Sequence, residues 1–266
     1  MTTPSDQLQY RFTHDTLFKM LFVKRPLLLK RLVAAILNTP MEEITDFTIT
    51  NPEMPPEAMG EKFSKLDIAM LAKQQQVNLE VQVEDEGDYP ERSLYYWARA
   101  YSSSLIAGKA YITLPRTIGI NILDYNMLAC KEYHSVYLPL EKTRHDLLTD
   151  KMEMIYLELR KLPDEIDKTN DLEVILQLLK ARTERDLKEV KDMNVPYIDE
   201  AIETYREVIA SDEFKEIERI RHRARHDEAS ILYNLERKLE HKWQAVVDDK
   251  DAEIERLRAL LEKREE

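Results

Sequence analysis

Two short stretches decide the fold: Lys65-Leu-Asp-Ile-Ala-Met-Leu-Ala72 and Val77-Asn-Leu-Glu-Val-Gln-Val83. In both, apolar side chains recur at every second position, which is the period of a half-buried β-strand. The connection between them, Lys73-Gln-Gln-Gln76, is short and polar. The pattern therefore predicts an antiparallel hairpin over residues 65–83.

The hairpin register brings polar residues together on one face. A turn centred between Lys73 and Gln74 gives three apolar pairs, namely Leu66 with Val81, Ile68 with Leu79, and Met70 with Val77. The same register places Asp67 opposite Glu80, with Cβ atoms about 4.5–5.5 Å apart. Facing carboxylates repel unless a shared proton or a divalent cation lies between them, and oxygen ligands of this kind suit Mg²⁺ or Mn²⁺. Gln82, next on that face, offers an oxygen and an amide donor to a water or a phosphate.

The segments around the hairpin predict a mixed α/β core that ends near residue 160. A first helix starts at Thr13 and is interrupted at Pro26, which begins a second helix. The other expected elements are strands at 47–49, 117–123, 136–138 and 154–159 and a helix over 89–106. The strand over 117–123 is apolar on both faces, so we expect it at the centre of the sheet.

The second half of the chain predicts helices alone, over 171–190, 197–210 and 213–262. The last carries a heptad-like seam interrupted once, formed by Leu232, Leu235, Leu239, Trp243, Val246, Ile254, Leu257 and Leu261. This pattern favours a coiled coil over 228–262, and the alternative is one amphipathic helix that lies on its own domain. We expect three parts, namely residues 1–160, a helical accessory region over 161–227, and a coiled-coil tail over 228–266.

Charge and cysteine content limit the functional classes. The net charge of −12 is not that of a basic nucleic-acid module. A nucleic-acid contact would need a local patch, and the candidates are Lys19, Lys24, Arg25, Lys30 and Arg31, or Arg219, Arg221, Arg223 and Arg225. The single cysteine suits a reducing compartment, and no leader or membrane-spanning segment is recognisable. We therefore expect a cytoplasmic protein without a membrane partner.

Several segments in order carry a family resemblance. Asp67 followed by Glu80-Val-Gln82 resembles the D…E-x-Q variant of the PD-(D/E)XK nuclease signature, in which Gln replaces the usual Lys. The chain from about residue 10 to 160 is similar to the recombination-promoting nuclease and putative transposase family, through Asp15-Thr-Leu-Phe-Lys-Met-Leu-Phe22, Arg92-Ser-Leu-Tyr-Tyr96 and Gly108-Lys-Ala-Tyr111. The resemblance implies a restriction-endonuclease-like core in residues 1–160, Mg²⁺-dependent DNA endonuclease activity and a bacterial origin.

Four further residues are candidates for this site, each with an alternative. Asp15 either supplies a third carboxylate near the ion or stabilises a helix N-terminus. Lys19 either contacts a phosphate or lies on a solvated helix face. Arg92 and Tyr96 are one helical turn apart and either line the substrate groove or belong to the core.

The sequence is consistent with two functions. The first is a metal-dependent endonuclease that hydrolyses DNA phosphodiester bonds through Asp67, Glu80 and Gln82, in a homodimer joined by its coiled coil. The second is a catalytically weak or inactive module that binds DNA or protein and acts through its C-terminal helices. Gln82 and the acidic balance favour the second function, and the Asp67 and Glu80 pair favours the first.

Overall fold

The computed structural model describes residues 6–44, 46–49, 68–72, 74–105 and 108–265, with side-chain environments up to residue 257. Its centre is a six-stranded sheet with strand order β1-β2-β3-β4-β6-β5. The strands are β1 (Thr48–Ile49), β2 (Ile68–Ala72), β3 (Gln75–Gln82), β4 (Thr117–Leu123), β5 (His134–Tyr137) and β6 (Met152–Glu158). Strands β3, β4 and β6 are parallel and the others antiparallel, so the predicted mixed α/β core is confirmed.

The predicted hairpin register is confirmed over the described part of the two strands. Ile68 pairs with Leu79 and Met70 pairs with Val77. Gln74 turns the chain with φ +58°, and its backbone N–H donates to Asp46 Oδ2 at 2.7 Å. The expected pair of Leu66 with Val81 and the position of Asp67 lie outside the described residues.

Strand β4 lies at the centre of the sheet, as its two apolar faces predicted. All seven of its residues are buried. At Gly119, an added Cβ would come 2.8 Å from Met154 Sδ on β6, so a larger residue here would require the Met154 side chain to shift. The described strand elements therefore form one tightly packed sheet.

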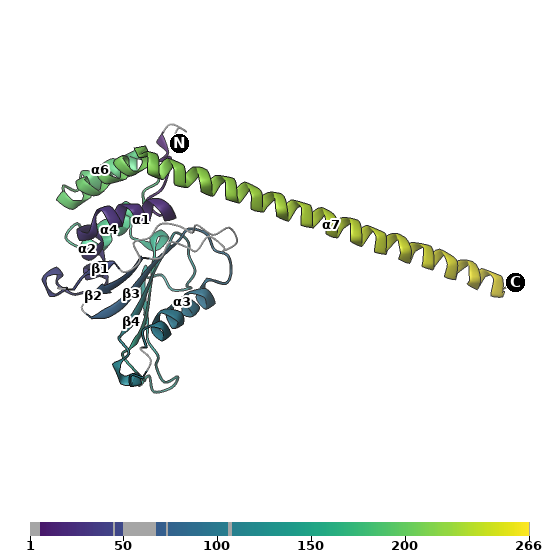
Figure 1. Cartoon of the computed structure of the whole chain (residues 1–266), viewed down its shortest axis with the longest axis horizontal. Coiled ribbons are helices and arrows are strands. Elements are labelled where there is room, and N and C mark those ends of the chain that lie inside the picture. Colours follow the sequence, from purple (N-terminus) through teal and green to yellow (C-terminus); the bar gives the residue numbers. More distant parts are fainter. Residues whose placement is uncertain (1–5, 45, 50–67, 73, 106–107, 266) are drawn as a thin grey trace. The chain divides into compact units, whose positions relative to one another are not determined.

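Helices cover both faces of this sheet (Figure 1). Helix α3 (Tyr89–Ser103) packs on β3 and β4, where Tyr89 and Trp97 join an apolar cluster with Leu123, Met154 and Tyr156. On the other side lie α1 (Asp15–Lys24), α2 (Pro26–Ile36) and α4 (Asp171–Lys180). Helix α6 (Pro196–Ala210) packs against α1, and α4 packs against α2. In the described connections, short 3₁₀ helices lie at Met41–Glu43, Tyr111–Thr113 and Leu159–Lys161.

The expected single helix over 171–190 is wrong, because two helices occupy this range. The chain leaves the helical conformation at Ala181, and Thr183 caps a new helix, α5 (Glu184–Lys191). Thr183 Oγ1 accepts from the Asp186 N–H, and Asp186 accepts from the Thr183 N–H, a reciprocal capping box. The break places Arg182 in extended chain, from which its guanidinium reaches a buried carboxylate described below.

The contacts divide the chain differently from the three expected parts. One compact unit runs from residue 1 to 214 and a second from 215 to 266. Helices α4 and α6 pack on α2 and α1, so this region belongs with the sheet rather than apart from it. Helix α7 (Asp212–Glu265) is a single continuous helix.

Candidate active site

One face of β3 is polar although it lies beneath a helix. Glu80 and Gln82 point to the face that α3 covers, and their side chains are buried, with 3% and 4% exposure. The intervening Val81 and the preceding Leu79 point to the opposite face, as expected for strand alternation. The α/β packing therefore buries a carboxylate and an amide at the carboxyl end of this strand.

Hydrogen bonds from a neighbour on β3 and from α3 position Glu80. Asn78 Nδ2 donates to Glu80 Oε1 at 3.3 Å. The Tyr89 hydroxyl, at the start of α3, lies 3.2 Å from Glu80 Oε2 and 2.8 Å from Asn121 Oδ1. Asn121 is the register partner of Glu80 on β4, and its Nδ2 donates to the Ile155 carbonyl at 3.1 Å. The hydrogen bond to the Ile155 carbonyl fixes the orientation of the Asn121 amide, so its oxygen faces the Tyr89 hydroxyl. The single Tyr89 hydroxyl proton is therefore shared between Asn121 Oδ1 and Glu80 Oε2.

Gln82 is positioned through both its side chain and its backbone. Its Nε2 donates to the Glu84 carbonyl at 2.9 Å, and its carbonyl accepts from the Asp124 N–H at 2.9 Å. The amide donor expected to contact a ligand is therefore bound within the protein. Among the described residues no hydrogen bond to Gln82 Oε1 is present, so the oxygen is the atom this side chain offers.

Buried hydroxyls line the rest of this face. Ser93 Oγ on α3 lies 2.7 Å from the Tyr156 hydroxyl on β6. Burial raises the pKa of Tyr156, and it raises the pKa of Tyr125 to about 12. Both phenols consequently keep their protons at neutral pH, so neither adds a negative charge near Glu80.

The other predicted site residues have different environments. Asp15 is the half-buried first residue of α1, and Lys19, one turn later, is buried at 1% exposure. The interpretation of Lys19 as a solvated residue is therefore wrong. Arg92 forms an ion pair with Glu86, and its guanidinium carbon lies 5.0 Å from the Tyr89 ring centroid. Tyr96 is half-buried on the same helix.

Sequence reasoning missed Tyr89 and Asn121, which contact Glu80 or its partner. Asn121 carried a signal, because it is the polar residue inside the apolar run Ile118–Leu123. Tyr89 carried none, since only the packing of α3 on the sheet brings its hydroxyl to Glu80. The structure thus adds two residues that position the site.

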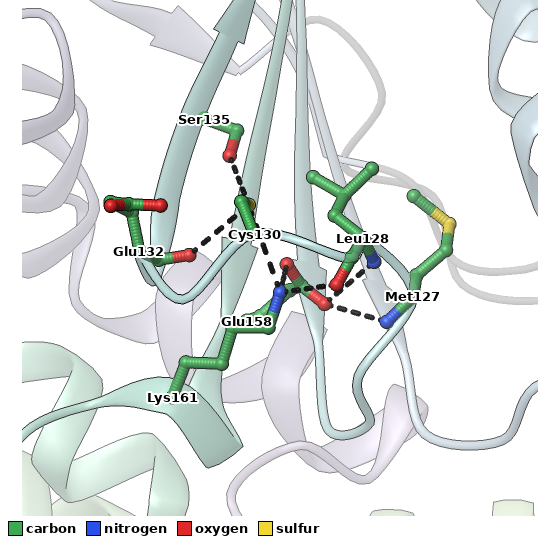
Figure 2. Close-up of polar contacts among 7 residues, drawn as sticks. All are labelled: Met127, Leu128, Cys130, Glu132, Ser135, Glu158 and Lys161. Carbon is green, nitrogen blue, oxygen red and sulfur yellow. Dashed lines mark hydrogen bonds and ion pairs between the residues drawn. The ribbon is translucent and has the colours of Figure 1, made fainter.

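Two other buried carboxylates lie at the carboxyl edge of the parallel strands. Glu158, at the end of β6, accepts from the Met127 and Leu128 N–H groups at 2.6 and 3.1 Å and pairs with Lys161 (Figure 2). Lys161 Nζ also donates to the Leu128 carbonyl at 2.7 Å and lies 3.9 Å from Cys130 Sγ. These bonds fix the loop after β4 to the end of β6. Glu158 is thereby a structural carboxylate.

Asp124 is the second of these carboxylates and has three arginine neighbours. Its side chain is 3% exposed. Arg11 Nη1 donates to Oδ2 at 3.0 Å, Arg182 Nη2 donates to Oδ1 at 2.8 Å, and Arg160 Nε lies 3.7 Å from Oδ1. Three segments distant in sequence therefore meet at the end of β4.

The basic patch expected near the N-terminus is largely engaged in pairs. Lys24, Arg25 and Arg31 line a cavity of about 560 Å³. Arg25 Nε donates to Thr204 Oγ1 at 2.6 Å, and Arg31 Nη1 donates to Asp171 Oδ2 at 2.8 Å. These two cations mainly join α2 to the helices around it.

The oxygen donors on β3 fit a divalent cation in their chemistry. Carboxylate and amide oxygens, as in Glu80 and Gln82, are ligands that Mg²⁺ accepts. Among the described residues no cluster of three His, Cys, Asp or Glu side chains could hold a metal. Asp67, the predicted partner of Glu80, is not one of those residues.

Comparison with known proteins identifies the family. Residues 12–234 match the model of the PD-(D/E)XK nuclease family transposases, so the chain belongs to that family. Searches of curated proteins and of solved structures found no match. The mixed sheet with flanking helices fits the restriction-endonuclease-like fold, and membership indicates nuclease or transposase-related activity on DNA. In the described part of the chain, every helix is too short or too polar to cross a bilayer.

Proposed function

We propose that this protein is a metal-dependent endodeoxyribonuclease, with Asp67, Glu80 and Gln82 as its catalytic residues. The observation that carries the proposal is the buried Glu80 carboxylate, held by Tyr89 and Asn78 at the carboxyl end of β3 in a chain of a nuclease family. Burial of a carboxylate is costly, so its retention in a fixed rotamer beneath a helix favours a role in binding or catalysis.

The cation would be Mg²⁺ or Mn²⁺, held by Glu80 and Asp67, with Asp15 as a further candidate. A divalent cation at such a site polarises the phosphate and promotes attack by water. The Tyr89 hydroxyl would fix the position of the Glu80 carboxylate. Gln82 Oε1 would accept a hydrogen bond from a water molecule beside the phosphate. Gln82 lacks the charge that Lys would bring to the phosphate, which predicts slower turnover than an E-x-K site.

The family relationship supports a link between strand cleavage and recombination or mobile-element activity. Transposition requires cleavage of DNA strands, and hydrolysis at this site would supply that step. The rival proposal is a binding module with weak or no turnover, supported by Gln82 and by the net charge of −12.

We also propose that α7 joins two copies of the chain. Its seam is exposed along the described part of the helix, with Leu235 and Leu239 at 50% and 56% exposure. Leu261 belongs to the same predicted seam but lies outside the described side chains. An apolar stripe of this length is commonly buried in a coiled coil, and a dimer would provide two sites for two strands.

Incubation of the full chain with supercoiled plasmid separates the enzyme from the binding module. We expect nicking with Mg²⁺ and none with a chelator. Glu80→Gln should abolish nicking, while Glu91→Gln, which alters an exposed acid on α3, should not. Equal nicking by both variants would exclude Glu80 from the site, and an inactive parent that binds the plasmid would favour the rival proposal.

A further inference from the structure

A second cavity lies beside the arginines that surround Asp124. It has a volume of about 390 Å³ and is lined by Arg160, Gln177, Lys180, Ala181, Arg182 and Asp186. Arg160 lies in the 3₁₀ helix that follows β6, Lys180 is the last residue of α4, and Arg182 lies in the break between α4 and α5. The cavity is therefore a basic pocket formed by the tertiary fold of the first unit.

The two carboxylates of this cluster are already engaged by the protein. Asp124 is buried and bonds to Arg11 and Arg182. Asp186 Oδ2 accepts from the backbone N–H groups of Arg182 and Thr183 at 2.8 and 2.9 Å. Both negative charges thus serve to orient the arginines and to cap α5.

The cations retain capacity for a ligand. The side chains of Arg11, Arg160 and Arg182 are 43%, 51% and 43% exposed. Lys180 has no ion pair with any residue in the described ranges. With Arg11, the cluster has four cationic side chains and two carboxylates, an excess of two positive charges that attracts an anion.

Gln177 adds an uncommitted amide to the same pocket. Its Oε1 is buried and has no hydrogen-bond partner in the described part of the chain. An amide can exchange its oxygen and nitrogen positions by rotation, which lets Gln177 present donors to an anionic ligand. Planar guanidinium groups with an amide donor are the usual partners of phosphate oxygens.

The pocket lies at the same sheet edge as the candidate active site. Gln82, Leu123 and Glu158 are in register at the carboxyl ends of β3, β4 and β6. The Asp124 N–H donates to the Gln82 carbonyl, and Arg160 follows Glu158 by two residues. A strand bound at Gln82 would therefore pass near these cations.

We propose that Arg160, Lys180 and Arg182 bind a backbone phosphate of the DNA substrate that does not itself react. This subsite rests on the proposed function for its ligand, and it deepens that function by naming where the strand is held. It contributes affinity and register rather than chemistry, as phosphate contacts do in other DNA-binding proteins.

The test measures DNA binding by fluorescence anisotropy of a labelled duplex, with a chelator present so that no cleavage occurs. The full chain carrying Lys180→Gln and Arg160→Gln is compared with one carrying Lys109→Gln and Lys142→Gln. The control lysines are exposed and lie in the connections before β4 and before β6, at the opposite edge of the sheet. Arg182 is left intact, because its loss would leave the buried Asp124 short of a partner.

Each phosphate contact that is lost should lower the slope of log affinity against log salt by about 0.9. We expect the pocket variant to lose this one phosphate contact, with about tenfold loss of affinity at 0.1 M salt. The control variant should retain the slope of the parent. Equal slopes for parent and pocket variant, or a parent that does not bind DNA, would overturn the subsite.

A parallel plasmid assay distinguishes this failure from failure of the proposed function. If the parent nicks DNA and the pocket variant has the same salt dependence of affinity as the parent, the subsite is excluded and the proposed nuclease activity stands. If the parent does not nick DNA but the pocket variant has a lower salt slope than the parent, the subsite is supported, on a protein that binds DNA without cleaving it.

Discussion

The hydroxyl of Tyr89 offers a sharp test of how the fold positions Glu80. Tyr89→Phe removes one oxygen atom and keeps the ring under the Arg92 guanidinium. The change deprives Asn121 Oδ1 of a donor at 2.8 Å and Glu80 Oε2 of a contact at 3.2 Å. Both acceptors are at most 3% exposed, so water does not readily replace the lost donor.

The size of the effect follows from that burial. Leaving a buried acceptor without a donor costs about 1–3 kcal/mol in the free energy of unfolding. For a unit of this size we expect Tm to fall by roughly 3–10 °C. Cleavage should fall by about 10–100-fold, the typical cost of removing a group that orients a metal ligand.

Ser93→Ala is the matched control, one helical turn along α3. It removes a buried hydroxyl that bonds Tyr156 rather than Glu80. We expect a comparable loss of stability by urea unfolding and a cleavage rate close to that of the parent. An unchanged stability for Tyr89→Phe, or an equal loss of cleavage in both variants, would refute the assignment of Tyr89 as the residue that positions Glu80.

Three further predictions concern pH, assembly and the amide at the site. Burial lowers the pKa of His134 below its ordinary 6.5, so the folded chain binds fewer protons than the unfolded chain. The folded state is therefore fully favoured above pH 6.5 and loses stability as the pH falls below that value. In urea unfolding at about pH 5.5 and pH 7.5, His134→Leu should reduce the difference between the two free energies of unfolding. Leu235→Lys with Leu239→Lys should convert a dimer to a monomer by light scattering, whereas Tyr233→Lys, off the seam, should not. Gln82→Lys should cleave at least as fast as the parent at saturating Mg²⁺ but need more Mg²⁺ for half-maximal rate, since like charge weakens ion binding.

Local pattern was sufficient to predict the hairpin and its register. A slip of one residue would move Ile68 and Met70 from the core to the other face, so the apolar pairs permit one alignment. The central place of β4 followed from its two apolar faces, and the start of α2 followed from Pro26, which fits the first position of a helix. These features depend on residues close in sequence.

Features that depend on distant residues were not predictable. The apolar period over 171–190 continues across Ala181, and local pattern favoured one helix. The helix breaks where Arg182 reaches Asp124, 58 residues earlier in the chain. Tyr89 likewise bonds Asn121, 32 residues later, through the packing of α3. Such contacts depend on how elements pack, which periodicity does not encode.

The position of the two candidate sites constrains the size of the substrate. Gln82 and Glu80 lie on the sheet face beneath α3, whereas Arg11 and Arg182 reach the end of β4 from the side of α1 and α4. A mononucleotide would occupy one of these sites, but a polymer that runs along the carboxyl edge could contact both. The positive charge of this edge is local, which reconciles DNA binding with a net charge of −12 on the whole chain. Binding that depends on both sites should therefore require a chain of several nucleotides.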